Sequence, residues 1–248
     1  MTLLKPVVES YLRDSCKSLM WVALVYTAVI AAIVLVVGVI SINYYDNTGV
    51  IMIGGAEVVF VLTMLIVCIS SFKGNIHFFI QHGISRRTAF LGFVLHLPIA
   101  GVVYAVTALF LTGLISWLPG TSLEAFLFGA IYYEWLGAMG TLPSFLIHFI
   151  WTWALLFTVG AAGYFFAALF YSLNTIGKIL LPVVIIVIIP MINRLTGGLI
   201  VQFKDWLSWM FRGGDAMNPL NDIGFFLVLS AIVLGFSWLF VRRYKLEK

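Results

Sequence analysis

The chain has 248 residues, of which 62% are hydrophobic and only 10% are charged. Soluble domains carry about 25% charged residues, so this composition excludes an ordinary water-soluble globular protein. The formal net charge of +4 comes without a long Lys/Arg cluster, which favours a role in membrane orientation over nucleic-acid binding. We therefore expect an all-α, polytopic membrane protein that forms a single transmembrane domain over residues 1–248.

The first segment, residues 3–17, is expected to form a helix that lies in the cytoplasmic interface. Its apolar residues recur at helical spacing, while Lys5, Glu9 and Arg13 fall on the rest of the helical wheel. A solvated tail is the alternative. The apolar run that follows is longer than the roughly 7–15 residues of a signal peptide, so we expect it to remain as a transmembrane helix.

Six apolar stretches are long enough to cross a bilayer, which takes about 20 residues in a helix. Pro182 and Pro190 are expected to kink the fifth of these spans. The predicted spans are Leu19–Ile42, Val50–Ser71, Ala89–Trp117, Pro143–Leu173, Ile176–Leu195 and Ile223–Val241. An even number of spans places both ends of the chain on the same side of the membrane.

The basic residues are distributed unevenly between the two sets of segments that flank the spans. Of the 14 lysines and arginines, only Arg194, Lys204 and Arg212 fall on one set, and the rest fall on the other. By the positive-inside rule, both termini and residues 73–88 are expected in the cytoplasm. The distribution therefore predicts a multi-pass membrane protein with both termini cytoplasmic.

Few polar side chains fall inside the predicted spans. Glu57 is the one acid well inside a span, and it fits either a structural hydrogen bond or a place in a translocation path. His96 and His148 are expected to be neutral and hydrogen-bonded between helices, with a proton-relay role as the alternative. His77 and His82 would point about 140° apart on a helix, so no shared metal ion is expected.

Residues 75–87 separate the second and third spans and combine apolar with basic side chains. The apolar residues recur at helical spacing, and Gly83 can end a short amphipathic helix in a left-handed conformation. Ser85 can then cap the third span, with Arg86 and Arg87 at the membrane surface. The segment fits either a polar loop that anchors the topology or a surface that another protein grips.

Residues 199–211, between the fifth and sixth spans, form an apolar stripe at helical spacing that includes Phe203 and Trp206. At 1.5 Å per residue, a helix of about 13 residues is too short for a hydrocarbon core of about 30 Å. Glycine pairs flank the segment on both sides. We expect an external helix that either closes the exit path of a substrate or only anchors the neighbouring spans.

Together these features resemble the membrane-spanning permease subunit of ABC transporters of the type-2 export class. The resemblance rests on the interfacial helix, on six spans with both ends inside, on HGISRRTAF between spans two and three, and on the ending FVRRYKLEK. In that family the stretch shaped like HGxSRRxxF is a coupling helix that docks onto a separate ATPase. The resemblance implies ATPase-coupling roles for Phe78, Phe79, His82, Arg86 and Arg87.

The resemblance implies a permease without catalytic residues or a cofactor of its own. The chain lacks the G-x-x-x-x-G-K-[ST] phosphate loop, so ATP and Mg²⁺ would be bound by the partner ATPase. The resemblance implies a location in the cytoplasmic membrane of a bacterium, where such permeases work among the membrane lipids as dimers, here with a second copy or a paralogue. The expected cargo is a hydrophobic or amphipathic peptide, antimicrobial or lipid, whether exported, flipped or removed for self-protection.

Two other classes of function remain open. A six-span intramembrane enzyme, such as a protease or a lipid-modifying enzyme, would need polar residues clustered at one depth. Only Glu57, His96 and His148 are available for that role, and the chain has no H-E-x-x-H, C-x-x-C or G-x-S-x-G motif. A secondary carrier would show inverted repeats or interrupted helices in matching positions, which the sequence lacks.

Overall fold

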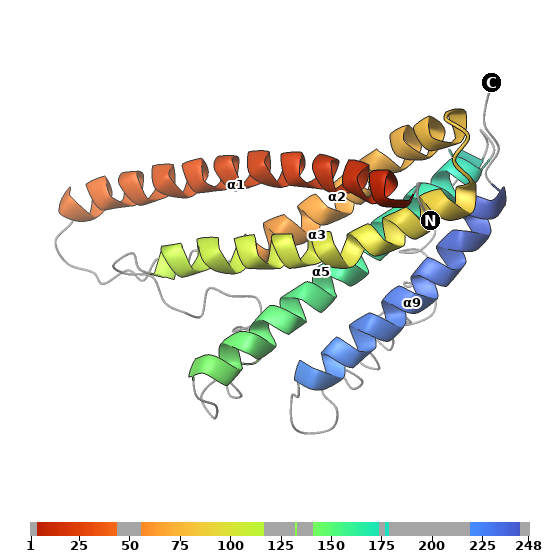
Figure 1. Ribbon diagram of the computed structural model, residues 1–248. Coiled ribbons are helices and arrows are strands. Elements are labelled where there is room, and N and C mark those ends of the chain that lie inside the picture. Colours follow the sequence, from red (N-terminus) through yellow and green to blue (C-terminus); the bar gives the residue numbers. More distant parts are fainter. Residues whose placement is uncertain are drawn as a thin grey trace, which may run out of the picture.

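The described part of the chain forms five helices and contains no β-strand (Figure 1). They are α1 (Leu4–Asn43), α2 (Ala56–Gln81), α3 (Arg86–Ser116), α5 (Thr141–Ser172) and α9 (Pro219–Arg243). The computed structural model describes residues 4–43, 56–116, 132, 141–173, 177–178 and 219–243, with the side chains of α1 described as far as Val25. The predicted fifth span and the predicted external helix, 199–211, lie outside the described residues, apart from 177–178.

Four of the described helices, α2, α3, α5 and α9, are long and apolar enough to cross a membrane. They cover all or most of four of the predicted spans, and α1 contains a fifth, Leu19–Ile42. Only the first part of that span has described side chains, so the count of four applies to the described residues alone. The described part of the chain is therefore all-helical and has the architecture of a multi-pass membrane protein.

The structure differs from the expected interfacial helix at residues 3–17. α1 continues without a break from Leu4 to Asn43, so the segment and the span after it form one helix. No glycine or proline occurs between Pro6 and Gly38 to interrupt it. Its apolar stripe does not face headgroups, because Val7 and Tyr11 are fully buried against other helices.

The structure also differs from the expected separate coupling helix at residues 75–87. α2 continues through Gln81, and α3 begins at Arg86, so the segment comprises the end of one helix, a tight corner and the start of the next. α2 continues as far as Gln81 because Ile76 and Phe79 are buried in the same hydrophobic core as the earlier turns of the helix, and this packing stabilises the additional turns.

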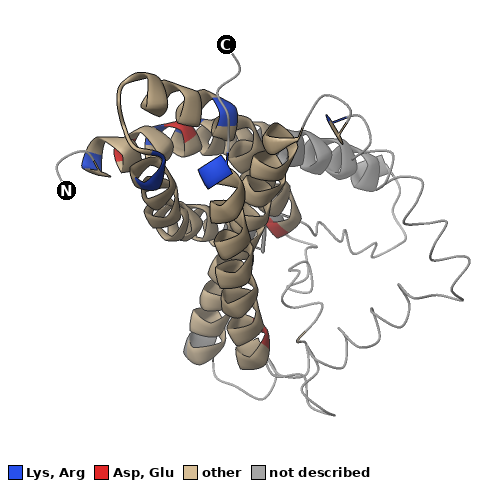
Figure 2. Ribbon diagram, turned by 90° about the vertical axis from the view of Figure 1, so that its right-hand side faces the viewer, with Lys and Arg blue, Asp and Glu red and all other residues tan. Residues whose placement is uncertain are grey.

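One end of the bundle, here called the basic end, carries the starts of α1 and α3 and the final turns of α2, α5 and α9. In Figure 2 the Lys and Arg segments gather at this end. Contacts fix the helix directions: Asn75 on α2 bonds to Asp14 on α1, and Arg86 at the start of α3 bonds to the last turn of α9. The basic residues that sequence analysis assigned to one side of the membrane thus lie together, wherever they are described.

α5 and α9 run in the same direction along each other. Near the start of α9, the Thr158 hydroxyl donates to the carbonyl oxygen of Phe226 at 2.8 Å, and further along both helices the rings of Phe165 and Phe240 lie 5.8 Å apart. Both helices therefore end at the basic end. The end of α5 and the start of α9 therefore lie at opposite ends of the bundle.

Candidate functional site

The corner between α2 and α3 is built from local sequence chemistry. Gly83 has φ +75°, the left-handed region that favours glycine. The amide of Ile84 donates to the carbonyl of Phe79 at 2.9 Å, and that of Gly83 donates to Ile80 at 3.1 Å. This pair of hydrogen bonds is a Schellman motif, and it confirms the predicted role of Gly83 in ending the helix.

Ser85 precedes α3 and caps its first turn, as predicted. Its hydroxyl oxygen accepts a hydrogen bond from the backbone amide of Thr88 at 3.1 Å, which satisfies one of the unpaired donors in the first turn. The two side-chain hydroxyls also lie 2.8 Å apart. Termination of α2 and initiation of α3 thus occur within three residues, and the corner has a defined shape.

The last two turns of α2, which lead into the corner, pack against α1. The ring of Phe79 is 2% exposed and lies 5.5 Å from the ring of Tyr11. One turn earlier, the Asn75 amide donates to Asp14 Oδ2 at 3.3 Å. Because aromatic packing and a hydrogen bond hold the last two turns of α2 against α1, a force on the corner would be transmitted to both helices.

The five predicted coupling residues divide into an exposed and an internal group. Phe78 is 52% exposed, and His82 and Arg87 are also exposed. His82 is held in place, since its Nδ1 donates to the Phe78 carbonyl at 2.8 Å and the two rings lie 4.1 Å apart. Phe79 is buried, and Arg86 is half-buried with its guanidinium donating to the carbonyl oxygen of Arg242 at 2.9 Å.

Glu57, His96 and His148, the ionisable residues singled out inside the predicted spans, belong to two separate hydrogen-bonded pairs. Glu57 on α2 is buried and hydrogen-bonds to Nε2 of His148 on α5. His96 on α3 lies elsewhere, with its Nε2 2.8 Å from the hydroxyl of Ser15 on α1. Both histidines are hydrogen-bonded between helices, as predicted. The three residues do not converge, and the described residues contain no group of three His, Cys, Asp or Glu side chains that could hold a metal ion.

Of the three residues predicted to line a translocation path or gate, Glu57 is among the described residues. Glu57 hydrogen-bonds to His148, and its place in a translocation path stays a prediction. Phe203 and Trp206 lie outside the described residues, so their role as a gate stays a prediction.

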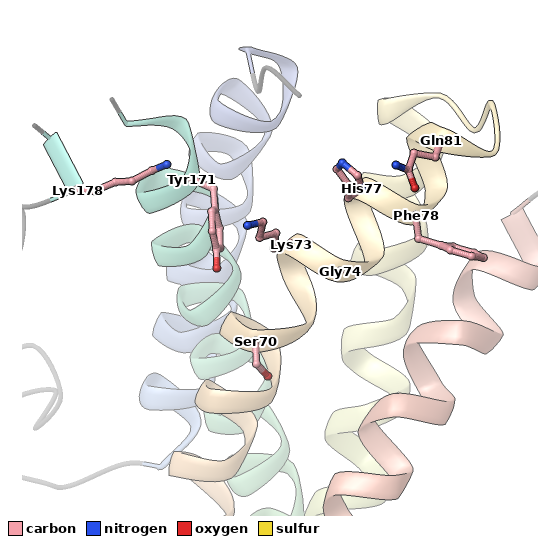
Figure 3. A pocket seen from close by; sticks show the side chains of 8 residues that line it. All are labelled: Ser70, Lys73, Gly74, His77, Phe78, Gln81, Tyr171 and Lys178. Atoms are coloured by element: carbon pink, nitrogen blue, oxygen red, sulfur yellow. The ribbon is translucent and has the colours of Figure 1, made fainter. Parts of the chain in front are cut away.

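A cavity of about 680 Å³ was not anticipated from the sequence (Figure 3). It lies at the basic end, between the last turns of α2 and the end of α5, and both Lys73 and Lys178 line it. The sequence carries one signal for it on α2, where Ser70, Lys73, His77 and Gln81 follow each other at helical spacing. Lys178 could not be found in this way, because it is distant in sequence.

The fold and these contacts define the chain as a multi-pass helical membrane protein with a structured, basic corner at one end. Comparisons with protein-family models, with curated proteins and with solved structures gave no match to this chain. Its function has to be argued from the geometry of its own residues.

Proposed function

We propose that the chain is the membrane-embedded permease subunit of an ATP-driven ABC exporter and that the α2–α3 corner is where a separate ATPase docks. The observation that carries the proposal is the corner itself. It presents an exposed aromatic ring, Phe78, on the last turn of α2 and an exposed cation, Arg87, on the first turn of α3, and a Schellman motif and a helix cap fix the backbone between them. Aromatic and arginine side chains on a rigid support are typical anchors of protein–protein interfaces.

The contacts of the corner suit the transmission of movement. Phe79 joins it to α1 through Tyr11, and Arg86 joins it to the last turn of α9 through Arg242. A displacement of the corner by a partner would therefore shift α1, α2, α3 and α9 together. Coupled rigid-body movement of helices is a known means by which membrane and soluble proteins switch state.

Six spans are part of this proposal. α1, α2, α3, α5 and α9 account for five crossings if α1 spans the membrane along its 40 residues. The parallel arrangement of α5 and α9 requires the joining segment to return across the bundle. The predicted span Ile176–Leu195 would supply that return, and both termini would then lie at the basic end, in the cytoplasm.

The partners and cargo follow from the same proposal. The ATPase would bind ATP and Mg²⁺, a second permease copy or paralogue would complete a dimer, and the cargo would be a hydrophobic or amphipathic peptide, antimicrobial or lipid. The intramembrane-enzyme alternative gains no support, because Glu57 and His148 are separate from His96.

Co-purification tests the proposal. The chain is expressed together with candidate ABC ATPases from its source cell, and the amount of ATPase retained on the tagged permease is measured. Phe78→Ser should weaken the complex about tenfold, because truncating an aromatic anchor commonly costs more than about 1 kcal/mol. Arg87→Glu should weaken it as well, by reversing an exposed charge at the interface.

The matched control is Arg243→Glu, which reverses an exposed charge at the basic end but outside the corner. This variant should retain the ATPase. If no ATPase co-purifies with the unaltered chain, or if all three variants retain it equally, the corner is not the docking site.

A further inference from the structure

The cavity at the basic end has a polar wall formed by one face of α2. Ser70, Lys73, His77 and Gln81 succeed each other at intervals of three or four residues, so their side chains line up on successive turns. A hydroxyl, an ammonium, an imidazole and an amide can all donate hydrogen bonds. The wall is thus suited to a ligand that accepts several of them.

The charge in the cavity is positive. Lys73 and Lys178 approach it from α2 and from beyond the end of α5, and the described lining residues include no Asp or Glu (Figure 3). The Lys73 ammonium lies 5.7 Å from the centre of the Tyr171 ring, a cation–π contact that holds it at the cavity wall. Tyr171 is itself stacked on Phe72 at 5.8 Å, which fixes the ring that supports the lysine.

The cavity lies where the membrane-spanning part of α2 ends. On the same face of α2, one to three turns further from the basic end, Leu62, Ile66 and Ile69 expose their apolar side chains. The face therefore changes from apolar to basic where the membrane-spanning part of α2 reaches the basic end. A ligand with an anionic head and an apolar tail matches this change along the helix.

We infer that the cavity binds a phosphate group, carried by the headgroup of an anionic lipid in the leaflet at the basic end. Lysines act as point charges for phosphate, and basic pockets between transmembrane helices recognise lipid headgroups. A cavity of about 680 Å³ falls in the range of about 300–1,000 Å³ that is usual for small-ligand sites. This inference does not depend on the proposed transport function.

Native mass spectrometry of the purified full chain tests the inference. The protein is titrated with phosphatidylglycerol, with zwitterionic phosphatidylcholine and, separately, with inorganic phosphate as a competitor. We expect selective binding of phosphatidylglycerol, with affinity falling about fivefold for each of Lys73→Gln and Lys178→Gln. Lys17→Gln is the matched control, because it removes an exposed charge at the same end outside the cavity and should leave binding unchanged.

A second variant blocks the cavity without changing its charge. A Cβ atom on Gly74, which lines the cavity, would meet nothing within 4 Å, so Gly74→Leu fits the helix while filling the space beside Lys73. It should abolish selective binding and leave the folded state intact. Gly224→Leu on α9, where a Cβ also meets nothing within 4 Å, is the control and should bind like the unaltered chain.

The outcomes separate the sources of the phosphate. Displacement of phosphatidylglycerol by inorganic phosphate, with the same dependence on both lysines, would support the site and assign it to a soluble phosphate. Equal binding of the two lipids, or unchanged selectivity in both lysine variants and in Gly74→Leu, would overturn the inference.

Discussion

Glu57 on α2 and His148 on α5 hydrogen-bond to each other within the helix bundle, and both side chains are buried. The pair lies near the starts of these two parallel helices, whereas the rings of Phe72 and Tyr164, 4.9 Å apart, pack together toward their basic ends. A polar contact and an aromatic contact thus hold α2 against α5 at two levels. A carboxylate is tolerated inside a span because an imidazole on the neighbouring helix faces it.

Removal of one member of this pair should destabilise the protein more than removal of both. Glu57→Leu or His148→Leu leaves the other polar group buried without this partner, at a cost of about 1–3 kcal/mol each. The double variant should lose less than the sum, and unfolding in detergent micelles would measure the difference. Thr63→Val is the control, because its hydroxyl bonds within its own helix to Val59. Additive losses would show that the pair is not coupled.

The same double variant distinguishes the two roles that the sequence leaves open for Glu57. If the hydrogen bond is purely structural, the folded Glu57→Leu/His148→Leu protein should still export its cargo. If the pair lines the translocation path, export should fail although the protein folds and retains its ATPase.

The closeness of α2 and α5 predicts different effects at two glycines of α5. A Cβ on Gly163 would lie 2.9 Å from the backbone oxygen of Leu65 and 3.1 Å from Cβ of Cys68, neither of which can rotate away. Gly163→Ala should therefore cost about 1–3 kcal/mol by overpacking. At Gly160 the nearest atoms are the ends of flexible side chains, so Gly160→Ala should change stability by less than about 1 kcal/mol. Equal effects in thermal unfolding would contradict this packing.

Cysteine accessibility tests the directions of α5 and α9. In a Cys16→Ser background, Leu220→Cys at the start of α9 should react with an impermeant maleimide in intact cells. Leu173→Cys, after α5, and Gln81→Cys, at the end of α2, should react only after permeabilisation, because the basic residues orient that end inward. Labelling of positions 173 and 220 from the same side would rule out the return crossing and the six-span topology.

Local chemistry explains why part of the site was predictable. The corner follows from a glycine that accepts positive φ and a serine that caps the next helix, and both effects act within a few residues. The interhelical bonds of His96 and His148 were also predictable, since a buried imidazole in a span needs a partner. The identity of each partner was not, because it depends on which helices are neighbours.

Tertiary packing decided the features that the sequence left undetermined. Adjacent phenylalanines look alike in sequence, yet Phe79 packs on Tyr11 and Phe78 points outward. Arg86 and Arg87 likewise differ because only the first reaches the end of α9. The expected helix breaks near residues 17 and 75 are absent: no glycine or proline stands near residue 17, and Gly74 alone does not end α2, whose buried residues continue beyond it.

Site-specific crosslinking at residue 78 tests the docking role of the corner most directly. A photoreactive group is attached to Phe78→Cys in the Cys16→Ser background, and the chain is reconstituted with the ABC ATPase that co-purifies with it. Ile66→Cys, at an exposed position on the membrane-spanning part of α2, is the control. We expect a crosslink to the ATPase from position 78 and none from position 66. The absence of a crosslink from position 78 in a complex that hydrolyses ATP would contradict the proposed coupling site.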